Sequence, residues 1–238
     1  MDSITNHGDV SQVATQGANI HLPYNVRINE YHRQAARLTL KYTTKTAGRV
    51  LDIGCGTGFV LDIIAKENSR LALFGADIDP QCLKLTKQKS NTINTIQLTE
   101  DEPLMALNGK TYDTIIMSHV LEHTEYPLKV LGDVMKLLEP GGHLVLLVPN
   151  PVRLDVVLFN LFRYHYVNRG HIHAWDRSHW MNFLERIAGL NVIEYASDDI
   201  KLFPWQIKER IKFLYAIERQ LAVLIPWWSF SNIAVIRK

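Results

Sequence analysis

The sequence predicts an α/β fold built around a mainly parallel, buried sheet. From residue 49 onward, short apolar runs alternate with segments of helical periodicity, which is the pattern of repeated strand–helix units. At Val50–Gly58 one such apolar run leads directly into glycines at alternate positions and then into a helical segment. Glycines at such a turn let the backbone bend tightly and let a ligand approach without meeting a Cβ atom.

The elements follow in order along the chain. Residues 1–23 are polar, show little periodicity and are expected to form a flexible arm, and an amphipathic helix is expected over residues 24–44. Short apolar runs predict the strands Arg49–Ile53, Leu71–Ala76, Thr95–Leu98, Asp113–Met117, His143–Val148, Asn191–Tyr195 and Asn232–Arg237. Helical spacing between them predicts the helices Gly58–Glu67, Pro80–Lys89, Pro127–Leu138 and Arg177–Ala188.

Local signals mark some boundaries, and two segments interrupt the alternation. Asp79-Pro80 offers an N-cap followed by proline at the first helical position, and residues 139–142 (EPGG) indicate a stop and a turn. Arg153–Val167 is expected to be a helical insertion over the ligand crevice, as a lid or substrate wall. Pro204–Ile225 is expected to be one amphipathic helix.

Composition bounds the class of protein. The 238 residues are 47% hydrophobic and 21% charged, which suffices for a sizeable core. The formal net charge is +2, so no nucleic-acid partner is expected. The 2 cysteines, Cys55 and Cys82, exclude a disulfide framework. The amino terminus lacks the pattern of a signal peptide, and no apolar run approaches the ~20 residues of a membrane span, so a cytoplasmic location without stable membrane insertion is expected.

The glycine pattern argues against a dinucleotide site. A G-x-G-x-x-G fingerprint would need a third glycine at position 59, which is Phe59. The acid Asp52 beside the loop would repel a pyrophosphate and suits a ligand that carries an ammonium group.

The segment Asp52–Gly58 resembles the first motif of the class I S-adenosylmethionine-dependent methyltransferases. The later motifs match in that family's order at Phe74–Pro80, Glu100–Glu102, Tyr112–His123 and Leu137–Pro149. The resemblance implies a three-layer Rossmann-like sandwich with a seven-stranded mixed sheet of order 3-2-1-4-5-7-6 and an antiparallel last strand. It also implies one domain over residues 24–238. Its expected parts are a cover helix (24–48), a cofactor-binding half (49–150), an insertion or lid (151–175) and a substrate-side half (176–238).

The resemblance implies S-adenosyl-L-methionine as the cofactor. In this family an acid at the end of the second strand takes the two ribose hydroxyls, which is the position of Asp77, and Asp101 best matches the acid that contacts adenine. The expected cofactor-binding residues are Asp52, Gly54, Cys55, Gly56, Gly58, Asp77, Ile78, Asp101, Glu102 and Ser118.

Histidines supply the candidate catalytic groups, because imidazole is the natural base at neutral pH for an acceptor hydroxyl. These candidates are His119, His123 and His171, although His123 also suits a packing or hydrogen-bonding role. No metal is expected. As an alternative, the segment with His119, Glu122 and His123 resembles one in metal-dependent members, and with a downstream ligand, His171 or His173, it would hold a divalent ion. Aromatic candidates for the acceptor pocket, each equally able to pack the core, are Tyr24, Tyr31, Phe162, Tyr166 and Trp175.

The functional prediction is methyl transfer to a hydroxyl, with an amine as second choice, of a small-molecule acceptor such as a specialised metabolite, glycan or lipid-linked intermediate. Two alternatives remain open at this point: a metal-assisted RNA 2′-O-methyltransferase and a non-catalytic methyltransferase-like scaffold. A homodimer is a further expectation. Residues 204–228 suit a lid, a dimer contact or a membrane contact.

Overall fold

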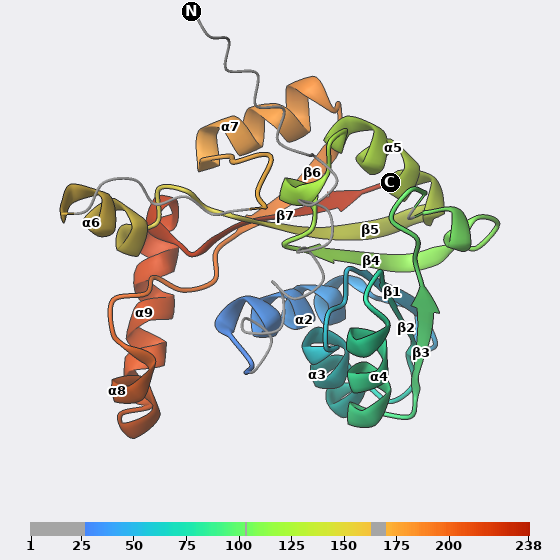
Figure 1. The fold of residues 1–238 in the computed structure, drawn as a ribbon, viewed down its shortest axis with the longest axis horizontal. Helices are drawn as coiled ribbons and strands as arrows, with labels where there is room; N and C mark the ends of the chain where they lie inside the picture. Colours follow the sequence, from blue (N-terminus) through green and yellow to red (C-terminus); the bar gives the residue numbers. More distant parts are fainter. Residues whose placement is uncertain (1–26, 103, 163–169) are drawn as a thin grey trace, which may run out of the picture.

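The computed structural model describes residues 27–102, 104–162 and 170–238. Within them, seven strands form a single mixed sheet in the order β3-β2-β1-β4-β5-β7-β6 (Figure 1). Strand β7 pairs antiparallel with both of its neighbours, and the other pairs are parallel. The predicted sheet, its order and its antiparallel last strand are confirmed. The strands are β1 (Arg49–Ile53), β2 (Ala72–Asp77), β3 (Ile93–Gln97), β4 (Tyr112–Ser118), β5 (Leu138–Pro149), β6 (Asn191–Ala196) and β7 (Ser231–Arg237).

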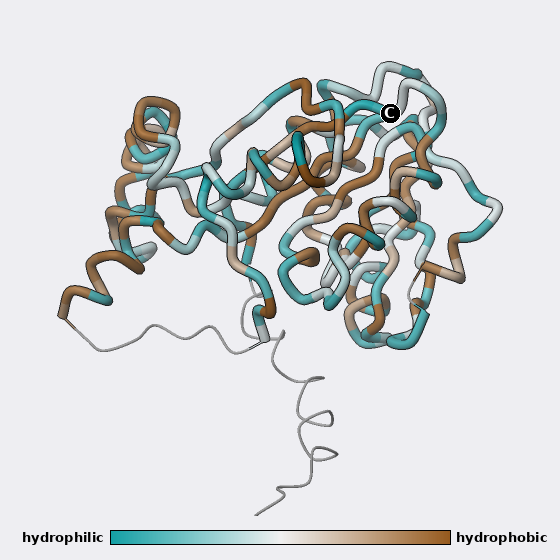
Figure 2. Tube along the Cα trace, turned by 90° about the horizontal axis from the view of Figure 1, so that it is seen from above, coloured by the Kyte–Doolittle hydropathy of each residue, from teal (hydrophilic) through white to brown (hydrophobic). Residues whose placement is uncertain are grey.

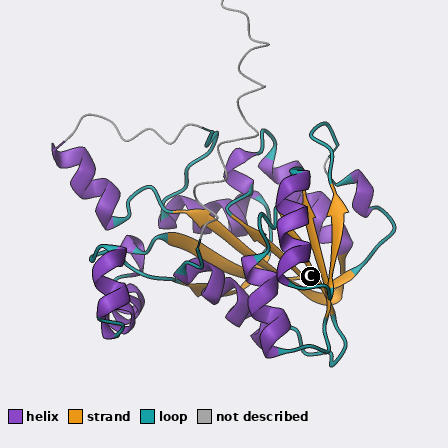
Figure 3. Cartoon of the chain, turned by 60° about the horizontal axis from the view of Figure 1, so that its bottom comes forward, coloured by secondary structure: helices purple, strands orange, loops and turns teal. Residues whose placement is uncertain are grey.

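Helices cover both faces of the sheet and make three layers (Figures 1 and 3). The first face carries α2 (Glu30–Tyr42), α3 (Phe59–Glu67) and α4 (Pro80–Lys89). The opposite face carries α5 (Pro127–Leu137) and α7 (Arg177–Asn182). Beyond the sheet, after β5 and β6, lie α6 (Leu154–Phe162), α8 (Trp205–Arg210) and α9 (Phe213–Leu224).

The strands alternate their side chains between two buried clusters. On β1, Val50 joins the cluster under α2, α3 and α4, whereas Leu51 joins the cluster under α5 and α7. On β4, Ile116 and Met117 divide between the same two clusters. The period of two along each strand therefore supplies apolar surface to both faces, as a doubly covered sheet requires.

The predicted helix starts and stops are largely where the structure has them. Asp79 caps α4, since its Oδ1 accepts from the Gln81 N–H at 2.8 Å, with Pro80 as the first helical residue. Helix α5 ends at Leu137. The EPGG segment lies within β5, where it forms a bulge between the residues paired with β4, Leu138 and His143. The expected helix over residues 177–188 becomes a π-helix at Phe183–Ile187.

The single helix predicted over Pro204–Ile225 is wrong. The segment forms two helices, α8 and α9, which separate around Ile211. Lys208 Nζ and Glu218 Oε2 lie 2.6 Å apart, although the residues are 10 apart in sequence. In one continuous helix they would be separated by roughly 15 Å along the axis. The buried ion pair therefore requires the break, which periodicity alone does not show.

Apolar side chains remain exposed on the helices beyond the sheet. Leu161 and Phe162 on α6 are 69% and 85% exposed, and Phe213 and Leu224 on α9 are 70% and 73% exposed. Figure 2 shows hydrophobic stretches along these outlying helices as well as along the central strands. Among the described residues, no helix is both long and apolar enough to cross a membrane.

The buried pair generates a stability prediction. Lys208→Met should lower the free energy of unfolding by about 3–5 kcal/mol, because it leaves the Glu218 carboxylate buried without its cation. Denaturant unfolding measures the change, and Lys212→Met, which removes an exposed lysine nearby, serves as control. A loss below about 1 kcal/mol for Lys208→Met would show that the pair does not hold α8 against α9.

Candidate active site

The glycine loop between β1 and α3 adopts a conformation that favours glycine. Gly54, Gly56 and Gly58 have φ angles of 70°, 52° and 75°. A Cβ atom at Gly58 would lie 2.6 Å from Thr86 Cγ2, and one at Gly54 would collide with Val120 Cγ2. The loop therefore lies tightly against its neighbours and keeps its backbone accessible to a ligand.

Asp77 at the end of β2 is tied to this loop. Its Oδ2 accepts from the Gly56 N–H at 2.7 Å, and its Oδ1 accepts from the Asp79 N–H at 2.9 Å. The side chain is 8% exposed, so the carboxylate is fixed at the edge of the sheet where β1 and β2 both end. Such a carboxylate retains acceptor capacity for a pair of hydroxyl groups.

Two further polar groups beside the loop have no hydrogen-bond partner in the described chain. Asp52 is 2% exposed, and its Oδ1 is unpartnered. Burial, together with the nearby Asp77, raises the pKa of Asp52 well above its usual value. Ser118 Oγ at the end of β4 is also buried and unpartnered. A buried polar group without a partner is costly, so these atoms fit a polar ligand at this edge.

The other predicted cofactor residues lie around the same edge. Cys55 is buried in the loop, and a Cβ atom at Gly75 would meet its Sγ at 2.9 Å. Burial raises the pKa of the Cys55 thiol well above its usual value, which favours the uncharged thiol in this packed position. Ile78 follows Asp77 and is 47% exposed. Asp101 and Glu102 are exposed in the loop after β3, and their contact with a ligand stays a prediction.

His119 begins the loop after β4 in a strained conformation. Its φ is 58°, the sole positive value among the described non-glycine residues. Its N–H donates to the Leu147 carbonyl at 3.0 Å, and its Nε2 lies 3.0 Å from Ser231 Oγ. Burial lowers the pKa of His119 well below its usual value, so the imidazole is neutral. The contacts with Leu147 on β5 and Ser231 on β7 hold His119 in one orientation.

Glu122 lies at the centre of a histidine cluster. The side chain is 1% exposed, and neither carboxyl oxygen has a hydrogen-bond partner on another residue of the described chain. Burial raises the pKa of Glu122 to about 8. Its Oε1 lies 3.8 Å from His123 Nε2, 4.0 Å from His171 Nε2 and 4.0 Å from His119 Nδ1. The three predicted catalytic histidines are thus brought together around one carboxyl group.

Backbone contacts select which downstream histidine joins this cluster. The N–H groups of Ile172 and His173 both donate to the Glu122 carbonyl, at 2.8 and 3.1 Å. This places His171 beside His123, with ring centroids 4.8 Å apart, whereas His173 stacks on Trp175 at 5.2 Å. Side-chain ligand atoms of Glu122, His123 and His171 all lie within 4.8 Å of one another. Of the two downstream histidines left open by the sequence, the group able to hold a metal contains His171, and it does not include the predicted His119.

The aromatic residues predicted for the acceptor pocket lie in different surroundings. Tyr31 stacks on His119 at 4.6 Å and lies against the site. Trp175 is buried among Trp180 and Phe183, whereas Phe162 is 85% exposed at the end of α6. For both residues, contact with an acceptor stays a prediction. Tyr24 and Tyr166 lie outside the described residues.

Phe230 is a site residue that the sequence prediction missed. Its ring stacks with those of Tyr31 and His119, with centroids 5.8 Å from each. It directly precedes β7, and because β7 runs antiparallel to β5, its start lies at the edge where β5 ends. No local motif marks it, since only this return of the chain brings it to the site.

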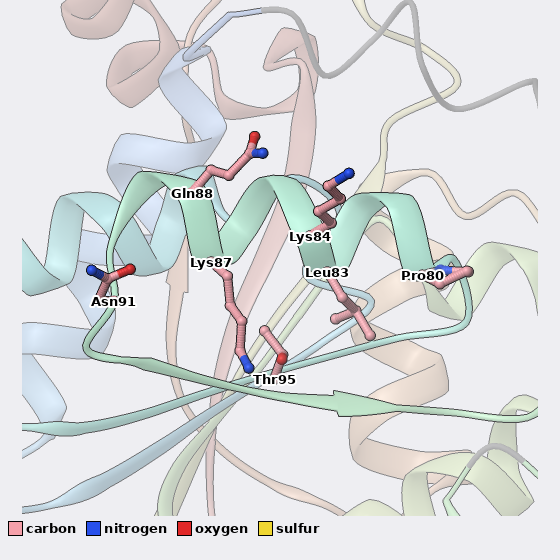
Figure 4. Close-up of a pocket in the computed structure, with 7 residues that line it drawn as sticks. All are labelled: Pro80, Leu83, Lys84, Lys87, Gln88, Asn91 and Thr95. Atoms are coloured by element: carbon pink, nitrogen blue, oxygen red, sulfur yellow. The ribbon is translucent and has the colours of Figure 1, made fainter.

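Two surface hollows lie apart from these groups. One, of about 540 Å³, lies between α4 and β3 (Figure 4). It is lined by Pro80, Leu83, Lys84, Lys87, Gln88, Asn91 and Thr95. The other, also of about 540 Å³, is lined by residues of α7 together with Val152, Asp176 and Trp227. Neither hollow includes the glycine loop or the histidine cluster.

Comparison with known proteins agrees with the fold and the motifs. The ubiquinone biosynthesis O-methyltransferase of Vibrio cholerae is 32% identical over 115 residues, which cover 44% of this chain and 46% of that protein. The chain thus spans about half the length of this curated relative. The plantazolicin methyltransferase BpumL, solved with a pentazolic desmethylPZN analog and SAH, matches 96% of this chain and 90% of its own at 19% identity, with a TM-score of 0.60.

The fold alone does not fix a reaction. The [4+2]-cyclase SpnF also matches, at 15% identity and a TM-score of 0.58, over 87% of this chain and 80% of its own. The family is shown by sequence, because a profile described as a methyltransferase domain matches residues 27–195. This chain belongs to the methyltransferase-domain family.

Proposed function

We propose that this chain transfers a methyl group from S-adenosylmethionine to a hydroxyl group of a small-molecule acceptor. One observation carries the proposal: the carboxyl groups of Asp52 and Asp77 and the cluster around Glu122 lie at the same edge of the sheet. The Vibrio cholerae relative, named for O-methylation in ubiquinone biosynthesis, supports a hydroxyl over an amine. The SAH in the BpumL structure supports the cofactor.

The residues beside the glycine loop fit the cofactor. Asp77 offers its carboxylate to the two ribose hydroxyls, and the unpartnered Asp52 Oδ1 and Ser118 Oγ suit the ammonium end of the methionine part. Exposed Ile78 offers an apolar contact for the adenine ring, and Asp101 offers an acceptor for its amino group. When bound, S-adenosylmethionine supplies an already activated methyl group on a sulfonium.

The protein then has to align the acceptor and accept its hydroxyl proton. Positioning alone is worth ~7–11 kcal/mol in favourable cases. We assign proton acceptance to the imidazoles of His123 and His171, which flank Glu122 and are half-buried. The Glu122 carboxyl lies 3.8 and 4.0 Å from them, and its ionised form, which a neighbouring imidazolium favours, stabilises the positive charge that forms. Neutral His119, held by Ser231, orients the acceptor.

A metal-assisted form of the same reaction is the second candidate. The observation in its favour is the gathering of Glu122, His123 and His171 ligand atoms within 4.8 Å. Two imidazoles and one carboxylate form a ligand set that zinc accepts. A metal held there would polarise the acceptor hydroxyl.

Cofactor binding depends on Asp77. Asp77→Ala should weaken S-adenosylmethionine binding at least 100-fold, because two charge-assisted hydrogen bonds of roughly 1.5–3 kcal/mol each are lost. Isothermal calorimetry measures the affinity, with Asp79→Ala as the control, since the Asp79 side chain caps α4 and accepts from Cys82 Sγ within that helix. Equal binding by wild type and Asp77→Ala, or no binding by the wild type, would contradict the assignment.

The histidine cluster should control turnover. His123→Asn and His171→Asn should each lower kcat about 10²–10⁴-fold without weakening cofactor binding, as expected for loss of a general base. Release of SAH with a panel of catechols reports the rate. His179→Asn, whose side chain is 76% exposed, is the control. Variants that retain turnover within about threefold of wild type would remove the cluster from the mechanism.

The metal candidate has a readout that does not depend on activity. Zn²⁺ titrated into chelator-treated protein should bind with one ion per chain and at least tenfold more weakly in Glu122→Gln. Glu125→Gln removes an exposed neighbouring carboxylate and should bind like wild type. Absence of zinc binding by the wild type would rule out the metal-assisted reaction and leave the imidazoles as the base.

A further inference from the structure

A pair of cations lies over one aromatic ring at the acceptor side of the site. Lys201 Nζ is 3.3 Å from the centroid of the Phe230 ring, and Arg153 Cζ is 4.6 Å from the same centroid. The ring also stacks with Tyr31 and His119. Among these side chains, only His119 is assigned a role in the proposed reaction.

The topology explains why these groups meet. Arg153 lies in the turn after β5, Lys201 in the loop after β6, and Phe230 directly before β7. Because β7 is antiparallel to both neighbours, all three positions fall at one edge of the sheet. The glycine loop after β1 and His119 after β4 lie at this same edge, since β1, β4 and β5 are parallel. The cations therefore lie at the edge of the sheet that also carries the glycine loop and His119.

Each neighbouring acid already has a partner, and for Asp155 that partner is Arg153 itself. Asp155 accepts from Arg153 Nε at 2.8 Å, and Asp199 Oδ2 lies 3.7 Å from Lys208 Nζ. Asp198 Oδ1 accepts from the Ser231 N–H at 3.0 Å, and burial raises the pKa of Asp198 to about 7. In the described part of the chain, Lys201 Nζ makes no hydrogen bond or ion pair within 4.0 Å. Burial lowers the pKa of Lys201, and the charges of Asp199, Asp198 and Asp155 act against this effect at longer range.

The charge of Lys201 also reaches the reacting side of the site. It contributes to lowering the pKa of both His119 and His32, after the larger effect of burial. Lys201, Arg153 and Phe230 are each partly exposed, so a bound molecule can contact them. A partly desolvated ammonium beside a guanidinium and an aromatic face is a recognition site for a negatively charged group on a planar molecule.

From this geometry, and resting on the proposed methyltransferase function, we propose that the acceptor carries an anionic substituent, of the carboxylate class, that binds Lys201 and Arg153 over the Phe230 ring. The methylated hydroxyl then lies toward the Glu122 cluster. Lys201 is in this view a specificity-determining residue, because it selects acceptors by charge and takes no part in the methyl transfer.

The test uses equilibrium binding of two matched probes to the full chain saturated with SAH. The probes are 3,4-dihydroxybenzoate and 3,4-dihydroxybenzamide, which differ in the charge of one substituent. The wild type should bind the acid at least 10-fold more tightly than the amide. Lys201→Met, which keeps the apolar stem, should lower this ratio severalfold while Arg153 retains part of it, and Lys201→Arg should restore most of the wild-type ratio. Lys212→Met, which removes an exposed cation outside the site, should retain the wild-type ratio.

Each outcome decides the inference separately from the reaction. Equal affinity for acid and amide in the wild type, no binding of the acid, or an unchanged ratio in Lys201→Met would overturn the anionic acceptor. Selective binding of the acid that depends on Lys201 supports it even if the probe is not methylated. A protein that binds SAH and the acid but transfers no methyl group to any hydroxyl acceptor would instead count against the proposed function.

Discussion

The site depends on the hydrogen bond between the Asp77 carboxylate and the Gly56 N–H. This bond joins the end of β2 to the loop after β1 and fixes the glycine loop in its left-handed conformation. It also holds a carboxylate next to Asp52, whose Oδ1 has no hydrogen-bond partner among the described residues. Two buried carboxylates side by side are unfavourable without a bound partner. The edge of the sheet is therefore built for a ligand that carries hydroxyl groups and a positive charge.

Glu122 has the same property on the acceptor side. The Glu122 side chain is buried, its pKa is raised, and imidazoles surround it. Its backbone carbonyl accepts the hydrogen bonds that fix the segment that carries His171. Both halves of the site thus contain carboxyl groups whose burial becomes favourable only with a partner. This common feature explains why the site residues are polar in positions where a purely structural sheet would be apolar. The proposed cofactor and acceptor residues lie on loops at one edge of the sheet, which is where open α/β sheets generally bind their ligands.

Much of this arrangement could be predicted because its signals are local. Asp52, the three loop glycines and Asp77 lie in short segments whose spacing directly reflects strand, turn and helix. The break between α8 and α9 could not be predicted, since it depends on a buried ion pair between residues far apart in the helical pattern. Phe230 and Lys201 were missed for a similar reason, because only the antiparallel return of β7 brings them to the site. The choice of His171 over His173 rests on backbone hydrogen bonds that no side-chain pattern encodes.

A crystal structure of the full chain with SAH tests the central claim most directly, because it locates both halves of the site at once. The account predicts the ribose hydroxyls on the Asp77 carboxylate, the amino group near Asp52, and the sulfur directed toward Glu122 and its histidines. Density for SAH in the hollow between α4 and β3, or a sulfur directed away from the cluster, would contradict it.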